Sequence, residues 1–152
     1  MWSSNKAVNR NSCIIPVLRT GDHCKSVDLA ALERHHLSNM PESKESEACK
    51  KQLKILLKKD ENKMCADCSA PNPTWASKNI GVFVCLQCSG MHRSLGVHIT
   101  QVRSITLDTW QKDWVHVMQY GNWTCNAQFE SRLDYSQKPI PTSSAEFKNA
   151  FI

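Results

Sequence analysis

The stretch CADCSAPNPTWASKNIGVFVCLQCSGMHRSLGVHITQVRSITLDTW, residues 65–110, contains two Cys-x-x-Cys pairs separated by sixteen residues. The pairs are Cys65 with Cys68 and Cys85 with Cys88. This spacing lets two short turns close around one tetrahedral Zn²⁺ with four thiolate ligands. Four sulfur ligands leave no coordination position for water or a substrate. We therefore expect one structural Zn²⁺ that holds the fold together.

The eight cysteines of this 152-residue chain could also indicate a secreted disulfide-rich protein or a thioredoxin-like redox protein. Near the N-terminus the only apolar run is residues 14–18, which is too short for the core of a signal peptide. A thioredoxin-like site needs one Cys-x-x-Cys at a strand-to-helix turn, whereas this chain has two at zinc-finger spacing. The sequence therefore favours metal binding in a reducing compartment.

The composition divides the chain at about residue 40. Residues 1–40 carry scattered apolar clusters without a sustained period, which predicts a poorly structured N-terminal extension. This part also contains Cys13, His23 and Cys24, but three ligands at irregular spacing favour free thiols over a second metal site. Residues 41–152 are predicted to form one folded domain with a modest core.

The segment after Pro41 has helical periodicity. Apolar residues recur at Cys49, Leu53 and Leu56-Leu57, which predicts an amphipathic helix that ends near residues 60–62 and packs on the zinc module.

The basic residues of the chain concentrate in the same segment. Residues 44–63 hold seven Lys or Arg against four Asp or Glu, more than half of the chain's formal excess of +5. Lys51, Lys54 and Lys58 share one face of the predicted helix. This face could meet an anionic membrane, an acidic protein or nucleic acid, or it could be only solvated.

The run IGVFV at residues 80–84 predicts a strand that leads into a helix over residues 85–95, which Gly96 ends. At about 100° per residue, Arg93 points about 140° away from Cys88. One face of this helix would bind the metal while another presents a guanidinium. The residues alone favour Arg93 as a solvated arginine or as the ion-pair partner of a carboxylate such as Asp108. His92, one turn past Cys88, is expected to hydrogen-bond and pack, since four cysteines already complete the metal site.

The rest of the chain predicts one more strand and three more helices. The strand covers residues 102–107, and the next helix, residues 111–120, would be capped by Asp108 or Thr109 and ended by Gly121. We expect Trp114, Val117 and Met118 on its buried face. Asn122 would cap a helix that reaches Leu133, and Ser143 with Glu146 would form a capping box for the last helix. That last helix ends among apolar residues and is expected to be incomplete. The predicted class is α+β, with a small four-cysteine zinc finger and a short β-sheet surrounded by α-helices.

Several motifs of the sequence resemble those of a known protein family. These are Cys-x-x-Cys, Pro-x-Trp-Ala-Ser, Asn-x-Gly-x-Phe-x-Cys-x-x-Cys-Ser-Gly-x-His-Arg-Ser-Leu-Gly-Val-His, Val-Arg-Ser-x-Thr-Leu-Asp-x-Trp and a later Gly-Asn pair. In this register, residues 46–152 resemble the GTPase-activating domain for ADP-ribosylation factors, the Arf GAP domain. The chain departs from the family pattern at Thr100, Cys125 and Asp134-Tyr135, which leaves the packing of the C-terminal arm open.

The resemblance implies a GTPase activator without independent catalysis, acting in vesicle trafficking on the GTP form of an Arf-family small GTPase. An arginine inserted by a partner can accelerate GTP hydrolysis by about 10³–10⁵. Arg93 matches this arginine finger. Trp75, Leu86 and Asp108 match positions that contact the GTPase or hold the finger, although core packing would explain Trp75 and Leu86 equally well. The expected location is cytoplasmic, peripheral to Golgi or endosomal membranes.

Three other functions fit parts of the sequence. A scaffold with the same fold could bind an Arf protein or a membrane without stimulating hydrolysis. A phosphoinositide-responsive adaptor would rest on the three lysines of the first helix. A GATA-like DNA-binding finger needs a basic recognition helix, but residues 86–110 contain only two arginines, Arg93 and Arg103, so no nucleic-acid partner is expected.

Overall fold

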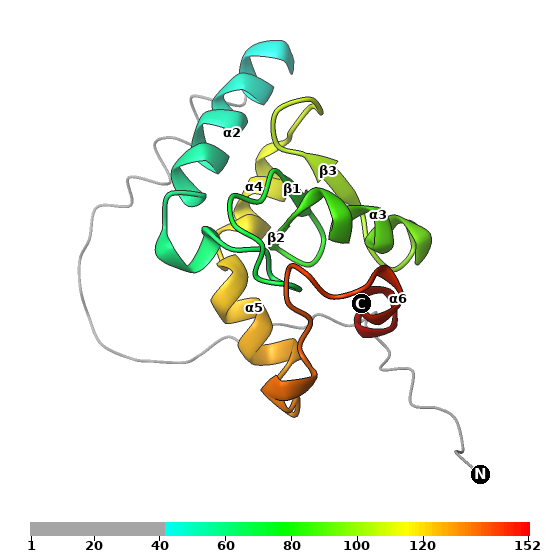
Figure 1. Cartoon of the computed structure of the whole chain (residues 1–152). Coiled ribbons are helices and arrows are strands. Elements are labelled where there is room, and N and C mark those ends of the chain that lie inside the picture. The colour runs from blue at the N-terminus through cyan, green and yellow to red at the C-terminus, as the bar shows by residue number, and fades with distance from the viewer. Residues whose placement is uncertain (1–41) are drawn as a thin grey trace.

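The structure is a computed structural model, and it describes the backbone of residues 42–152. A three-stranded antiparallel sheet in the order β2-β1-β3 lies among helices (Figure 1). The strands are β1 (Trp75–Ser77), β2 (Val82–Val84) and β3 (Val102–Ser104). The helices are α2 (Glu42–Leu56), η1 (Asp60–Asn62), α3 (Leu86–Ser94), α4 (Lys112–Met118), α5 (Gly121–Phe129), η2 (Tyr135–Gln137) and α6 (Ala145–Phe151).

The predicted α+β class, a small sheet surrounded by helices, is confirmed. The predicted N-terminal extension and the residues Cys13, His23 and Cys24 lie outside the described part of the chain, so those predictions stay untested. None of the described helices combines the length and the hydrophobicity that a bilayer span requires.

Side-chain alternation along β2 divides the buried residues between two cores. Val82 and Val84 point to one face of the sheet and Phe83 to the other, as the period of two in a strand requires. We call the first group the cysteine-side core. It comprises Cys65, Ala66, Cys68, Val82, Val84, Cys88 and Cys125. The second group is the apolar core. It comprises Cys49, Leu53, Ala76, Phe83, Ile105, Trp110, Val115 and Met118.

Helix α2 follows its predicted periodicity. Cys49 and Leu53 are buried in the apolar core, and Leu56 and Leu57 pack against it. The stripe therefore packs on the finger module as predicted, but on the face of the sheet that belongs to α4, away from the four cysteines. In Figure 1, α2 lies to the left of the sheet, whereas α3 and α6 lie to its right.

Two predicted helix caps were wrong. Asp108 does not cap α4: its Oδ2 accepts a hydrogen bond from the Ser104 backbone N at 2.7 Å, which shapes the turn after β3. The N-cap of α6 is Ser144, whose Oγ accepts from Phe147 N at 3.2 Å. Ser143 instead accepts from Ile140 N at 2.9 Å, in the turn before the helix. Asp108 and Ser143 thus each satisfy a backbone donor that precedes them in the chain, in a turn and not in a helix.

Gly121 ends the α4 segment as predicted, because the backbone stays right-handed through Tyr120 and turns left-handed at Gly121. The capping role of Asn122 was assigned wrongly, because its partners are distant in the chain. Gly121 begins α5 with φ +72°, and a Cβ there would lie 2.8 Å from Glu61 Oε1. The Asn122 side chain is buried within α5, where its Oδ1 accepts from Phe83 N at 2.7 Å and its Nδ2 donates to Phe83 O at 3.0 Å. Since β2 is an edge strand, this amide satisfies backbone groups that another strand would otherwise pair.

The structure accommodates the departures from the family pattern in different ways. Thr100 is buried, with its hydroxyl 2.8 Å from Ser77 Oγ. Cys125 belongs to the cysteine-side core and directs its thiol at Ile80 O, 3.3 Å away. Asp134 caps η2 by accepting from Ser136 N. The C-terminal arm is held by Lys148 of α6, which is fully buried and donates to Gln87 Oε1 of α3 and to Pro141 O, both at 2.6 Å.

Candidate functional site

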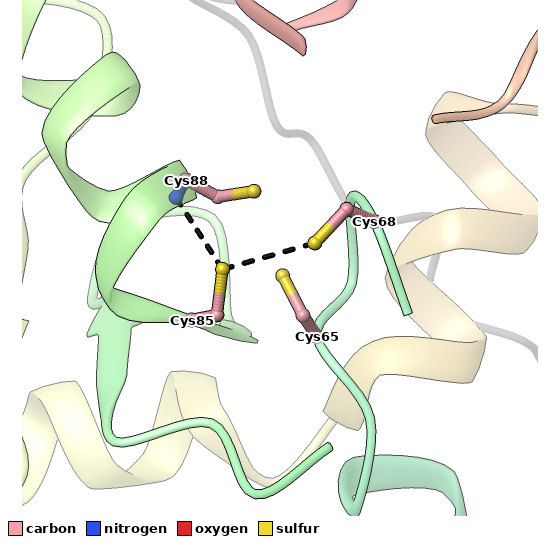
Figure 2. Close-up of side chains that lie close together, drawn as sticks. All are labelled: Cys65, Cys68, Cys85 and Cys88. Carbon is pink, nitrogen blue, oxygen red and sulfur yellow. Dashed lines mark hydrogen bonds between the residues drawn. The ribbon is translucent and has the colours of Figure 1, made fainter. Parts of the chain in front are cut away.

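The four cysteines converge as their spacing predicts. Figure 2 shows the side chains of Cys65, Cys68, Cys85 and Cys88 directed at one another, and the four Sγ atoms all lie within 4.8 Å of each other. Cys68 Sγ is 3.7 Å from Cys85 Sγ. In a tetrahedron with metal–sulfur bonds of about 2.3 Å, the edges would be about 3.8 Å, so this sulfur pair already has the separation that a tetrahedral site needs.

Backbone hydrogen bonds position each cysteine pair. The first pair lies in a turn where Cys65 N donates to Ala70 O at 2.7 Å, and Ser69 adopts φ +57° to turn the chain back. Ala66 N donates to Phe83 O at 2.9 Å, which fastens this turn to β2. The second pair straddles the start of α3, where the Sγ of Cys85, the N-cap, accepts from Cys88 N at 3.4 Å.

The electrostatics of the cluster favour a bound cation. Hydrogen bonds among the thiols raise the pKa of Cys65 and of Cys88, and they lower the pKa of Cys85. Four buried thiolates would repel one another, so they ionise together only when a positive charge neutralises them. The donor type, the number of donors and their separation therefore fit a metal ion that prefers sulfur and tetrahedral geometry.

His92 is not a member of this cluster. Its Nε2 lies 3.2 Å from Asp67 Oδ2, and both side chains are largely buried. Asp67 sits between the two cysteines of the first turn, so the hydrogen bond connects α3 to that turn. The predicted hydrogen-bonding role of His92 is thus confirmed, and the ring supports the placement of the ligands without joining them.

Arg93 points about 140° away from the buried Cys88 around the axis of α3. Its side chain is exposed, and its Cζ lies 4.5 Å from the centroid of the Trp75 ring, a cation–π contact. None of the ion pairs among the described residues includes Arg93. The alternative pairing with Asp108 is therefore wrong, because that carboxylate accepts from the Ser104 backbone instead.

Leu86 shares the outer face of α3 with Arg93. At about 100° per residue, Leu86, Gly90 and Arg93 fall within an arc of about 60°. Leu86 is 67% exposed, so core packing does not explain it. A Cβ added at Gly90 would meet nothing within 4 Å, so the fold does not require glycine there. Trp75 is half-buried at the edge of the cysteine-side core, with Arg93 over its ring.

Lys51 and Lys54 of α2, and Lys58 in the turn after it, lie apart from this face. Lys51, Lys54 and Lys58 are exposed, and no ion pair among the described residues includes them. Helix α2 packs on the apolar core, on the other side of the sheet from the cysteine cluster. The three lysines therefore lie on a different surface from Arg93.

Two cations near Arg93 were not singled out from the sequence. Lys78 follows β1 and Arg103 lies in the middle of β3, and both approach the ring of Trp114. The only signal available was the adjacency of β1 and β3, which no local pattern of the sequence encodes.

Comparison with known proteins identifies the family. Residues 50–152 match the model of the ArfGap family, described as "Putative GTPase activating protein for Arf". The "Probable ADP-ribosylation factor GTPase-activating protein AGD15" of Arabidopsis thaliana is 58% identical over 82 residues, which are 53% of this chain and 35% of that protein. The "ADP-ribosylation factor GTPase-activating protein AGD12" of the same plant is 46% identical over 106 residues, 68% of this chain and 32% of that protein. The chain thus spans about a third of the length of these relatives.

A solved structure agrees with this assignment. The "ArfGap domain of HIV-1 Rev binding protein" superposes with a TM-score of 0.62 and 28% sequence identity, covering 72% of this chain and 83% of that one. The match to the family model extends over more than half of the chain and includes all four cysteines and Arg93. The chain belongs to the ArfGap family.

Proposed function

We propose that this protein stimulates GTP hydrolysis by an Arf-family GTPase in its GTP form, with Arg93 as the arginine finger. The observation that carries the proposal is the placement of Arg93, which is exposed opposite the cysteine cluster and has no carboxylate partner in the described chain. A guanidinium held this way is available to another protein's active site. Family membership supplies the class of that partner.

The charge of the guanidinium accounts for the proposed acceleration. Negative charge develops on the phosphoryl oxygens as GTP is hydrolysed, and a planar donor fork placed beside them stabilises that charge. An acceleration of about 10³–10⁵ corresponds to about 4–7 kcal/mol of transition-state stabilisation. No ion pair among the described residues includes Arg93, so its charge is available to the nucleotide in the complex.

The fold prepares Arg93 for this role by limiting its motion. A free arginine side chain loses about 2 kcal/mol of rotamer entropy when it is immobilised. Stacking on the Trp75 ring at 4.5 Å restricts the guanidinium before the partner arrives. Trp75 in turn is held in β1, where it pairs with Val84 of β2. Val84 lies two residues before Leu86 in the chain. We propose that Trp75 and Leu86 contact the GTPase, and that Asp108 holds the loop after β3 in place.

We propose Zn²⁺ as the ion held by Cys65, Cys68, Cys85 and Cys88. When bound, it would join the two turns and fix the start of α3, because one cysteine pair lies in the first turn and the other at that helix start. The ion supplies rigidity only, since four protein thiolates complete its coordination. The rate enhancement therefore depends on side chains that the braced helix presents.

The decisive experiment measures GTP turnover by a GTP-loaded Arf protein with this chain and with Arg93→Ala. We expect the wild-type chain to accelerate turnover and Arg93→Ala to lose at least about 10³ of that acceleration. Arg132→Ala is the matched control, because it removes an exposed arginine that lies after α5, away from α3. Metal content and circular dichroism should be unchanged in both variants. Equal turnover with and without Arg93 would leave the scaffold as the function of this fold.

A membrane contact is the second part of the proposal. The lysines 51, 54 and 58 of the α2 segment are exposed and unpaired within the described chain, which favours attraction to anionic lipid at about 1 kcal/mol per residue near the surface. We propose that they help the protein act in the cytoplasm at Golgi or endosomal membranes during vesicle transport. Co-sedimentation with phosphatidylserine vesicles should fall with added salt and with all three lysines changed to Gln. Sedimentation that ignores both changes would refute this contact.

A further inference from the structure

Two further cations, Lys78 and Arg103, lie beside Arg93 and have no role in the function proposed above. Lys78, Arg93 and Arg103 line one groove of about 470 Å³, and none of its other lining residues is acidic. We call this the basic groove. No ion pair among the described residues includes Lys78 or Arg103. Three cations therefore face a common space to which the described residues contribute no carboxylate.

The fold holds two of these cations close together at a cost. Lys78 Nζ lies 3.3 Å from the centroid of the Trp114 ring, and Arg103 Cζ lies 5.8 Å from the same centroid. Burial and the neighbouring Arg103 guanidinium lower the pKa of Lys78. The aromatic face offsets part of the repulsion, but like charges this close remain unfavourable until an anion approaches them. Such an arrangement is typical of a surface that is completed by a partner.

The position of Arg93 in the basic groove indicates which kind of partner would bind there. Arg93 itself lines the basic groove, so any protein that receives Arg93 must also cover Lys78 and Arg103. Covering these cations with a neutral surface would remove water without replacing its interactions, which is costly. A membrane surface cannot occupy the groove while Arg93 is inserted in a protein. An acidic protein face satisfies both conditions.

We propose that the basic groove docks acidic side chains of the GTPase next to its nucleotide site, and that Lys78 and Arg103 orient the complex in which Arg93 acts. This inference rests on the proposed function for the identity of the partner. Lys78 and Arg103 are positioning residues here, because they contact the partner's surface and not the phosphates. Their contribution is to affinity and to the rate of encounter.

The test compares Arg103→Gln, Lys78→Gln and Arg103→Glu in steady-state GTP turnover with a GTP-loaded Arf protein at two salt concentrations. We expect each neutral variant to raise KM by about tenfold, to leave kcat within about twofold, and to weaken the salt dependence of kcat/KM. Arg103→Glu should raise KM further, and a Lys substitution of the facing acidic residue of the GTPase should restore it. The control Arg132→Gln should change neither parameter.

Several results would overturn the inference. If Arg103→Gln leaves KM unchanged but lowers the melting temperature, Arg103 only packs on Trp114 and does not dock the partner. A loss confined to kcat would place Arg103 in the chemistry and not in docking. Binding to phosphatidylserine vesicles that disappears in Arg103→Gln would assign the basic groove to lipid.

A direct binding measurement separates this inference from the proposed function. If the wild-type chain accelerates no turnover, its affinity for the GTP-loaded Arf protein can still be measured by calorimetry. An affinity of Arg103→Gln that is weaker by about tenfold would then support docking although the proposed activity had failed. Equal affinity of both chains would refute docking.

Discussion

The two faces of the sheet are stabilised in different ways. On the α2 and α4 face, the apolar core buries carbon-rich side chains such as Leu53, Phe83 and Trp110, each at most 1% exposed. On the α3 face, the cysteine-side core is built mainly from small residues around four thiols. The first face is stabilised by burial spread over many residues, whereas the second places four thiols where one bound metal ion would concentrate its stability.

This difference explains which face is free to meet a partner. A helix that is anchored by buried apolar residues must give a broad stripe of its surface to the core. Helix α3 is anchored instead through Cys88, Ser89 and His92, and its outer arc carries Leu86 and Arg93. A metal bound by the four cysteines would anchor this nine-residue helix with little packing area, and its outer surface stays exposed.

Metal removal should destabilise the protein more than any other change considered below. Structural Zn²⁺ contributes about 10–16 kcal/mol in finger peptides, which is as large as the whole stability of a typical domain. We expect a chelator, or Cys88→Ser, to unfold the cysteine side. The apolar core should be lost with it, because β2 contributes Val82 and Val84 to one core and Phe83 to the other. An amide NMR spectrum that stays dispersed in a metal-free chain would contradict this.

Arg93→Lys should have the next largest effect, and it should act on function alone. Lysine keeps the positive charge but lacks the planar fork and stacks less well on Trp75. We expect the loss of stimulated GTP turnover to approach that of Arg93→Ala, about 10³ or more. The thermal unfolding midpoint should not move, since Arg93 is exposed. Activity close to that of the wild-type chain would mean that charge alone suffices.

Leu53→Ala tests the apolar face. Leu53 is fully buried in α2, so its truncation should cost about 2–5 kcal/mol in denaturant unfolding. Ile55→Ala is the control in the same helix, because Ile55 is 63% exposed and its change should stay within about 0.5 kcal/mol. The folded variant should keep its metal and its activity. A Leu53→Ala protein that is as stable as Ile55→Ala would show that the two faces do not differ as described.

The smallest effect concerns Gly90 on the outer face of α3. Because a Cβ there meets nothing within 4 Å, Gly90→Ala should stabilise the helix by about 0.5–1 kcal/mol. Gly90→Gln should leave stability intact but lower stimulated turnover, since the longer side chain would occupy space between Leu86 and Arg93 that we assign to the GTPase. Gly81→Ala is the contrasting control and should destabilise, with φ +90° and Val117 O only 2.9 Å from the new Cβ. Full activity of Gly90→Gln would remove this face from the interface.

Local spacing was enough to predict the metal site and the main helices. Two Cys-x-x-Cys pairs bring four ligands together through turns that each span few residues, and the apolar period of α2 selects its buried face directly. The α+β class followed from the same patterns. Arg93 was placed on the correct side of α3 by helical geometry, but whether it pairs with a carboxylate was not readable from its neighbours in the chain.

Contacts between distant segments depended on how the elements pack. Asn122 completes the edge of β2 and Lys148 joins α6 to α3, in each case between residues far apart in the chain. The basic groove arises because β1 and β3 are neighbours in the sheet, which brings Lys78 and Arg103 to one tryptophan ring. Hydrogen bonds and charges act over a few ångströms, so their partners are defined only once packing has placed the segments. The spacing of the four cysteine ligands, by contrast, is a local property of the sequence, because each pair closes one short turn.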